Sequence, residues 1–304
     1  MSLTLGDGTA RRPTSPSLRK QLAARGLDGT TLLVLPALLA LLALFIYPFI
    51  YGLIVSFAPK AGPFYENYRK FFADPFLRRT IWHTLALSLP TTLLSILLAV
   101  PIAFRVRLMR RQKVLTTILL LPMTLGTVLV AQGLLTYLGA HGWFNRTLMS
   151  MGVISQPLEL TNNFWGVFVS LLLTGFPFTF LLTLSYVSGV DPALEEAAAT
   201  LGARSWQRFA RIYLPLLLPG LAVTFCLSFV QAFSVFPSAV LLGAPAGSTH
   251  VIAIAAYQAA FEQYNYSLGS AIAMIMGAAQ LIIVVLVLAS RQLFYRGPVG
   301  GTKG

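Results

Sequence analysis

Charged residues are scarce in this chain. Asp, Glu, Lys and Arg together make up 10% of its 304 residues, whereas apolar residues make up 56%. An ordinary soluble domain carries roughly 25% charged residues. The shortage of charge therefore argues against a water-soluble domain and predicts a protein embedded in lipid.

Cysteine and histidine are also rare. The single cysteine, Cys226, lies inside an apolar run, which excludes a disulfide within the chain and a cysteine metal site. The histidines, His83, His141 and His250, have no close Cys or Asp partner with which to form a catalytic or metal-binding group. We therefore expect neither an enzymatic site nor a metal in this chain.

Two further absences concern the source of energy. The sequence has no glycine-rich phosphate-binding loop ending in Lys and Ser or Thr. All nine acidic residues fall outside the long apolar runs, although carriers driven by protons or sodium usually keep ionisable groups at membrane depth. Backbone carbonyls could still bind sodium. These absences disfavour coupling to an ion gradient and predict that any energy for transport comes from another subunit.

Six apolar stretches are long enough to cross a bilayer as helices, which takes roughly 20 residues each. They lie at residues 32–57, 81–104, 114–138, 164–187, 212–235 and 270–290. The predicted fold class is therefore an all-α membrane protein with six transmembrane helices.

The positive charges predict the orientation of these helices, because cytoplasmic segments carry the excess of Lys and Arg. Sixteen of the 22 lie in the segments on one side, which include both termini, and six lie on the other. Both termini are therefore expected in the cytoplasm. This alternation also accounts for the net charge of +13, so no nucleic-acid partner is expected.

The two ends of the chain are expected to be cytoplasmic tails. Residues 1–30 are rich in Arg, Ser, Pro, Thr and Gly, which predicts a flexible basic tail, and residues 291–304 form the second tail. The apolar run at 31–57 has full spanning length, so we interpret it as a first transmembrane helix rather than a cleaved signal peptide.

The most informative stretch is the cytoplasmic loop between the fourth and fifth predicted helices, which reads DPALEEAAATLGARSWQRFARIYLPLLLPG. Asp191 can cap a short helix with Pro192 at its first position, and Glu195 lies near the positive end of the helix dipole. Gly202 permits the turn that ends this helix, and Ser205 can begin a second one.

This loop resembles the cytoplasmic signature of binding-protein-dependent ABC importers, which is E-A-A, three residues, G, nine residues and then I-x-L-P. Every position of the pattern matches. The matching residues are Glu196, Ala197, Ala198, Gly202, Ile212, Leu214 and Pro215. An amphipathic helix on the inner face without a docking role is the alternative interpretation.

The resemblance implies a type I ABC importer permease with a MetI-like core at residues 81–290, including a coupling loop at 189–211, in a prokaryotic inner membrane. It implies that the short helix docks into a separate nucleotide-binding ATPase dimer, with Glu195 or Glu196 able to pair with a basic groove residue there. ATP and Mg would be bound by that partner, and no cofactor by this chain. A second permease subunit, identical or homologous, and an extracytoplasmic solute-binding protein complete the implied partners.

In permeases of this kind the last helices, with the third, line the translocation path. Polar residues recur along one face of the fifth predicted helix, with Phe233 among the aromatic residues beside them. The candidate path residues are Gln132, Ser228, Gln231, Ser234, Ser238 and Phe233. Hydrogen bonding between packed helices is the alternative role for this polar face.

The substrate class is less well indicated than the family. The general pattern resembles the spermidine/putrescine, phosphonate and ferric-iron branch, and a polyamine is favoured slightly, with a sugar as a further candidate. The absence of carboxylates from the predicted helices argues against a polyamine, unless a partner permease supplies them. Two other classes remain open: a secondary carrier or channel that works without an ATPase, and a non-transporting membrane scaffold.

Overall fold

The computed structural model describes residues 29–294, and the side chains of residues 33–290 within them. The described part is helical and contains no strand. It divides into two compact units, Met1–Gly52 and Leu53–Gly304. The predicted tails at 1–30 and 291–304 lie almost wholly outside the described residues, and the cytoplasmic position of the termini stays a prediction.

The described part of the first unit is one long apolar helix. This helix, α2 (Gly29–Ser56), has 28 residues, and its last turn is counted with the second unit. Within it, Leu33–Ser56 is long and apolar enough to cross a membrane. The predicted first span is therefore confirmed as a helix of spanning length.

The second unit contains the remaining elements. In chain order these are α3 (Glu66–Ala73), α4 (Pro75–Val106), α5 (Gln112–Thr124), α6 (Thr127–Leu138), α7 (Trp143–Ser150), α8 (Phe164–Ser188), α9 (Pro192–Thr200), α10 (Ser205–Arg208), the π-helix η1 (Phe209–Tyr213), α11 (Leu214–Phe233), α12 (Pro237–Leu241), α13 (Ile252–Tyr257), the π-helix η2 (Gln258–Glu262) and α14 (Tyr266–Phe294).

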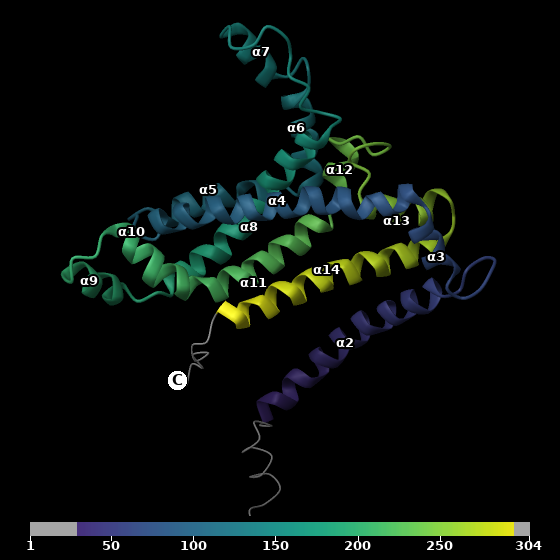
Figure 1. Cartoon of the computed structure of the whole chain (residues 1–304), viewed down its shortest axis with the longest axis horizontal. Helices are drawn as coiled ribbons and strands as arrows, with labels where there is room; N and C mark the ends of the chain where they lie inside the picture. Colours follow the sequence, from purple (N-terminus) through teal and green to yellow (C-terminus); the bar gives the residue numbers. More distant parts are fainter. Residues whose placement is uncertain (1–28, 295–304) are drawn as a thin grey trace, which may run out of the picture. The chain divides into compact units, whose positions relative to one another are not determined.

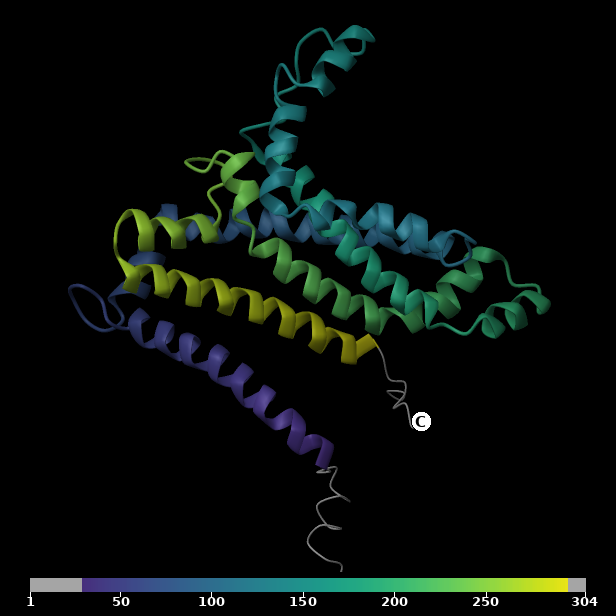
Figure 2. The same cartoon turned by 180° about the vertical axis from the view of Figure 1, so that it is seen from behind.

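Five of these helices form a bundle. Figure 1 shows α4, α5, α8, α11 and α14 running side by side, with α9 and α10 at one end and α3 and α13 at the other. Seen from behind in Figure 2, α11 lies between α8 and α14. The helices that carry the predicted coupling loop and the predicted path thus belong to one packed unit.

The longest bundle helix, α4, explains how the bundle packs so closely. Asp74 caps its start by accepting a hydrogen bond from the Phe76 backbone N–H at 2.8 Å, and Pro75 occupies the first position. Its buried face consists largely of small residues. These include Thr80, Thr84, Ser88, Thr91, Thr92, Ser95, Ala99 and Ala103. Small side chains let neighbouring helices approach closely inside a membrane, which is how α8 and α11 pack against α4.

The predicted spans agree well with the observed helices in most places. The fourth, at 164–187, corresponds to Phe164–Ser188, and the sixth, at 270–290, lies inside Tyr266–Ser290. The second extends beyond its predicted limits to Pro75–Val106. The fifth begins earlier than predicted, because α10, η1 and α11 join into one helical stretch, Ser205–Phe233.

The third predicted span, at 114–138, is wrong as a single straight helix. The structure breaks it between α5 and α6, and the segments Gln112–Thr124 and Thr127–Ser150 meet at 90°. Gly126, with a φ of 76°, caps the start of α6 in a conformation that L-residues with a Cβ rarely adopt. As a result α5 follows the bundle, whereas α6 and α7 turn away from it (Figure 1).

The apolar core of the bundle consists of three clusters along its length. One cluster, with Phe229, Phe233 and Ile272 fully buried, joins α11 to α13 and α14. A second joins α4, α8 and α12 around Leu242, and a third surrounds Phe180 where α4, α8 and α11 meet near the α9 end. The bundle therefore connects the predicted loop and the predicted path through one packed core.

Candidate functional site

The short helix of the predicted coupling loop forms where the sequence indicates. The Asp191 carboxylate accepts a hydrogen bond from the Ala193 backbone N–H at 2.9 Å and caps α9, with Pro192 at its first position. The start of this helix is therefore determined by two adjacent residues.

The end of α9 is a Schellman turn built on Gly202. The Gly202 N–H donates to the Ala199 carbonyl, and the Ala203 N–H donates to the Ala198 carbonyl, both at 3.0 Å. Gly202 has a φ of +79°, in the left-handed region that favours glycine. Gly202 of the signature is therefore required by the backbone of this turn.

The second predicted helix also begins at Ser205, as α10, and then widens into the π-helix η1. The widening coincides with Pro215, which has no N–H to donate and whose ring would crowd the carbonyl four residues earlier. In η1 the Leu214 N–H reaches back to the Phe209 carbonyl, which is the five-residue step of a π-helix. Pro215 thus changes the register of the helix at the point where the loop joins α11.

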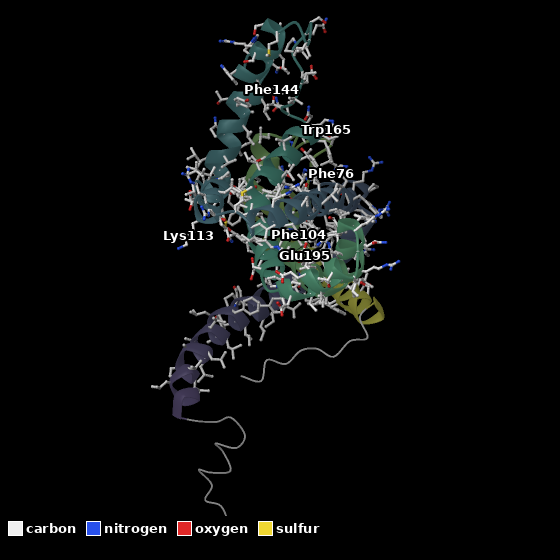
Figure 3. The ribbon with its side chains drawn as sticks, turned by 90° about the vertical axis from the view of Figure 1, so that its left-hand side faces the viewer. Phe76, Phe104, Lys113, Phe144, Trp165 and Glu195 are labelled. Atoms are coloured by element: carbon white, nitrogen blue, oxygen red, sulfur yellow. The ribbon has the colours of Figure 1, made fainter. Side chains whose placement is uncertain are left out.

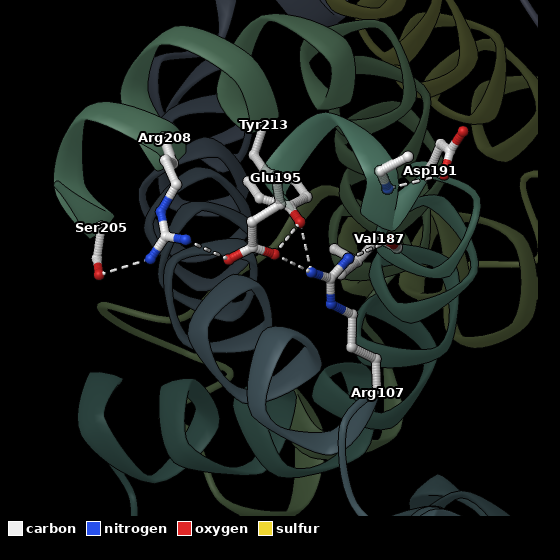
Figure 4. A network of polar contacts seen from close by, with 8 residues as sticks. Arg107, Val187, Asp191, Glu195, Ser205, Arg208 and Tyr213 are labelled. Atoms are coloured by element: carbon white, nitrogen blue, oxygen red, sulfur yellow. Dashed lines mark hydrogen bonds and ion pairs between the residues drawn. The ribbon is translucent and has the colours of Figure 1, made fainter. Parts of the chain in front are cut away.

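A partly buried polar network holds α9 against the bundle, and sequence reasoning did not identify it (Figure 4). Arg107, just after α4, donates to the Glu195 carboxylate at 3.0 Å, and Tyr213 in η1 also donates to Glu195. Arg208 lies 3.6 Å from the same carboxylate, and Arg107 also donates to the Val187 carbonyl at 3.2 Å. The network therefore ties α9 to α4, α8 and η1.

The members of the network are shielded from solvent to different degrees. The Tyr213 residue is 3% exposed, and the side chains of Arg107 and Glu195 are 10% and 34% exposed. The Arg107 guanidinium lies 4.8 Å from the centre of the Tyr213 ring and 5.1 Å from that of Phe104, so cation–π attraction adds to the ion pair. Glu195 is therefore already engaged within its own chain.

The other residues of the signature stand free or lie where the loop meets α11. Glu196 and Ala197 are exposed, Ala198 and Ile212 are half-buried, and Leu214 and Pro215 are exposed. The apolar side chains of Leu201 and Trp206 are 87% and 73% exposed beside the turn at Gly202. Figure 3 looks onto this end of the bundle, where Glu195 and Phe104 are labelled. This end thus presents one free carboxylate and an exposed apolar surface.

A polar pocket of about 150 Å³ lies where α4, α8 and α11 meet the start of α12, and Thr127, Gln231 and Ser234 in its lining are exposed. Its polar lining consists of Thr91, Thr92, Ser95, Thr127, Thr174, Thr179, Ser228, Gln231, Ser234 and Ser238. No charged side chain is among the residues that line it. Four of the predicted path residues thus meet hydroxyls from α4 and α8 that the sequence did not single out.

The other two predicted path residues lie elsewhere. Gln132 lines a separate depression beside α6 and α12, and Phe233 is fully buried in the apolar cluster of α11, α13 and α14. Only the spacing of Thr and Ser along α4 and α8 could have pointed to the additional pocket residues. The role of all these residues in transport stays a prediction.

Potential metal ligands do not gather in the described part of the chain, where no group of three or more His, Cys, Asp or Glu could hold an ion. His250, in the loop before α13, is 2% exposed, and its Nδ1 donates to the Pro245 carbonyl. Burial lowers the pKa of His250, and nearby His83 adds a smaller effect in the same direction. Burial therefore favours the neutral form of this histidine, against the opposing effect of its hydrogen bond to Pro245 on the pKa.

Comparison with known proteins identifies the family. Residues 61–297 match the family described as binding-protein-dependent transport system inner membrane component. The spermidine/putrescine transport system permease protein PotB of Haemophilus influenzae is 32% identical over 200 residues, which are 63% of this chain and 70% of that protein. The probable sulfate transport system permease protein cysT of Prototheca wickerhamii is 33% identical over 175 residues, which are 58% of this chain and 66% of that protein.

Solved structures share the fold. A bacterial alginate ABC transporter in complex with an alginate pentasaccharide-bound periplasmic protein has a chain with a TM-score of 0.75 and 25% identity, covering 93% of this chain and 100% of that one. An inward-facing MetNI methionine ABC transporter gives 0.58 and 16% identity, covering 72% and 96%. With the family match extending over well more than half of its length, this chain belongs to the binding-protein-dependent transport system inner membrane components.

Proposed function

We propose that this chain is the transmembrane permease subunit of a type I ABC importer, in which ATP hydrolysis on a separate subunit drives uptake of a small solute. The observation that carries the proposal is the position of α9. It is a capped helix at one end of the bundle, fastened through Glu195 to Arg107 and Tyr213. A force applied to α9 from outside the chain would therefore reach α4 and α11 directly.

The exposed surface beside α9 is the proposed docking site for the ATPase dimer. Leu201 and Trp206 offer an apolar contact, and Glu196 offers a carboxylate for a basic groove residue. ATP and Mg bind to that partner in this proposal. Closure of the ATPase dimer would shift the permease between inward-open and outward-open states.

The remaining partners follow from the family. We propose a second permease subunit, identical or homologous, which completes the translocation path, and an extracytoplasmic solute-binding protein that delivers the substrate. The alginate transporter with the matching chain was captured with its periplasmic protein. The relatives that transport spermidine and putrescine support a polyamine-like substrate first, with sulfate-like anions, phosphonate, ferric iron or a sugar as the other candidates.

Assembly with the ATPase tests the proposal. The chain is reconstituted with its ATPase, second permease and binding protein, and ATP hydrolysis and solute uptake are measured together. Gly202→Pro removes the N–H that closes the turn and is incompatible with its positive φ, so we expect hydrolysis to continue while uptake falls at least about tenfold.

Because Gly202→Pro could also disturb folding, a second variant changes only an exposed side chain. Trp206→Ala should weaken binding of the ATPase roughly tenfold or more, whereas Trp165→Ala, an exposed tryptophan at the opposite end of α8, should leave it unchanged. Unchanged coupling in Gly202→Pro together with unchanged assembly in Trp206→Ala would contradict the role of the loop. Uptake by the chain alone, without an ATPase, would instead favour the secondary carrier.

A further inference from the structure

Most hydroxyls of the polar pocket already donate their proton in a hydrogen bond within the protein. A Ser or Thr hydroxyl carries one proton and two lone pairs, and a backbone carbonyl can only accept. Five of the lining hydroxyls donate to a carbonyl of their own helix at 2.7–3.1 Å. They belong to Thr91, Thr92, Thr174, Thr179 and Ser234. Toward the pocket, these five oxygens can therefore act only as acceptors, although Ser234 already accepts from the Gln280 amide at 2.8 Å and Thr179 has one lone pair engaged by Ser228.

Ser228 joins this set through its partner. Its Oγ lies 2.8 Å from the Thr179 Oγ1, whose own proton is donated to the Gly175 carbonyl at 3.1 Å. Both hydrogen bonds form together only if Ser228 donates. Toward the pocket, the Ser228 oxygen can therefore also act only as an acceptor.

Donors are the minority in this lining. The hydroxyls of Ser95 and Thr127 and the amide of Gln231 make no side-chain hydrogen bond within the described part of the chain. The Ser238 hydroxyl shares a hydrogen bond of 2.9 Å with Ser170. Six hydroxyls of the lining have already donated their protons, and three side chains still have a donor to offer. The pocket is therefore rich in hydrogen-bond acceptors.

The backbone adds negative potential of its own. α11 ends at Phe233, and Gln231, Ala232 and Ser234 around that end line the pocket. The carbonyls at a helix C-terminus carry a partial negative charge of about half an elementary charge, and broken membrane helices hold cations at such ends. The positive end of α6 contributes only Thr127 to the pocket, but the start of α12 also lines it, with Pro237 and Ser238. α12 has five residues against 20 in α11, so fewer peptide dipoles oppose the negative end of α11.

We propose that this pocket is a subsite for a protonated amine. An organic ammonium group has donors and no lone pairs, so its N–H bonds can be accepted by the oxygens of Thr91, Thr174 and Ser228. A sulfate or phosphonate group would place its oxygens against lone pairs. The hydroxyl oxygens thereby take the place of the carboxylates that an amine path would be expected to carry. This inference rests on the proposed import function.

Uptake of labelled putrescine by the complete reconstituted transporter tests the subsite. Thr174→Val keeps the shape but removes an acceptor, and a hydrogen bond to a charged group is worth enough to raise the KM of uptake roughly tenfold. Thr174→Ser restores the hydroxyl and should restore uptake. Thr183→Val on the same helix, a fully buried threonine outside the pocket, should leave both uptake and ATP hydrolysis unchanged.

Two outcomes would overturn the subsite while sparing the import function. One is ATP-driven uptake of sulfate, sodium or a hexose by the wild-type complex with none of putrescine. The other is putrescine uptake that is the same in Thr174→Val and Thr183→Val. A complex that shows no ATP-driven uptake of putrescine, sulfate, phosphonate, ferric iron or a sugar would instead remove the proposed function, and the subsite with it.

Discussion

At the scale of single residues, two adjacent glutamates of the coupling loop have different surroundings. Glu195 is bound by Arg107, Tyr213 and Arg208, whereas Glu196 is exposed. Removing the charge of Glu195 would leave Arg107, whose side chain is 10% exposed, without its anion. A glutamine here keeps an acceptor oxygen but not the negative charge, and hydrogen bonds between charged partners are roughly twice as strong as neutral ones.

Glu195→Gln should therefore loosen α9 without unfolding the bundle. The expected result is faster hydrogen exchange of the backbone amides at 193–203, measured by mass spectrometry on the purified chain. Glu196→Gln changes the same kind of side chain one residue later and should leave exchange as it was. Equal exchange in the two variants would mean that the network does not hold the helix.

The second residue-scale prediction concerns pH. Burial lowers the pKa of His250 below the value of about 6.5 that a histidine has in an unfolded chain. The unfolded state therefore takes up the proton first as the pH falls, and folding stability is kept above about pH 6.5 and lost below it. Thermal unfolding should occur at a lower temperature at about pH 5.5 than at about pH 7.5.

Replacing the histidine should remove this difference. His250→Asn retains a donor for the Pro245 carbonyl but does not titrate, so its unfolding should depend less on pH. His141→Asn alters an exposed histidine and should keep the wild-type dependence. A wild-type pH dependence in His250→Asn would assign the effect to another group.

At the scale of helices, α8 and α11 cross at Gly220. A Cβ at this position would lie 2.5 Å from the ring of Tyr186, closer than packed atoms can come. The nearest atoms are Cγ and the two Cδ atoms at the base of the ring, so the ring or the helices must shift to admit a methyl group. The contact therefore depends on the missing side chain, as is common where membrane helices pack.

Gly220→Ala should lower the stability of the bundle by about 1–3 kcal/mol, the usual cost of overpacking. Thermal unfolding in detergent measures the change. Gly277→Ala also adds one methyl to a long helix, but into open space, and should be neutral or slightly stabilising. A Gly220→Ala protein as stable as Gly277→Ala would show that α8 and α11 can move apart at no cost.

At the scale of the whole molecule, the sequence predicted what local chemistry determines. Spans such as 164–187 followed from apolar length, and α9 followed from the cap at Asp191 and the turn at Gly202. The break at Gly126 was missed because the apolar run continues across it without a charged residue. Such an apolar run does not indicate where a helix changes direction.

The rest depends on contacts between distant parts of the chain. Arg107 and Glu195 are separated by 88 residues, and hydropathy assigns them only to the same side of the membrane. For the same reason, only part of the pocket lining was predicted. Ser228 and its neighbours formed a recognisable stripe on one helix, but the hydroxyls that face them come from α4 and α8.

The long helix α4 connects the two ends of the bundle. Near one end of α4, Thr84 accepts a hydrogen bond from the Ile252 backbone N–H at 2.9 Å. Just beyond its other end, Arg107 donates a hydrogen bond to Glu195. Its 32 residues span about 48 Å, and Pro90 and Pro101 each remove one backbone hydrogen bond within it. We expect a tilt imposed at the coupling end to bend α4 at these two prolines, and the stretch between them supplies three hydroxyls to the pocket.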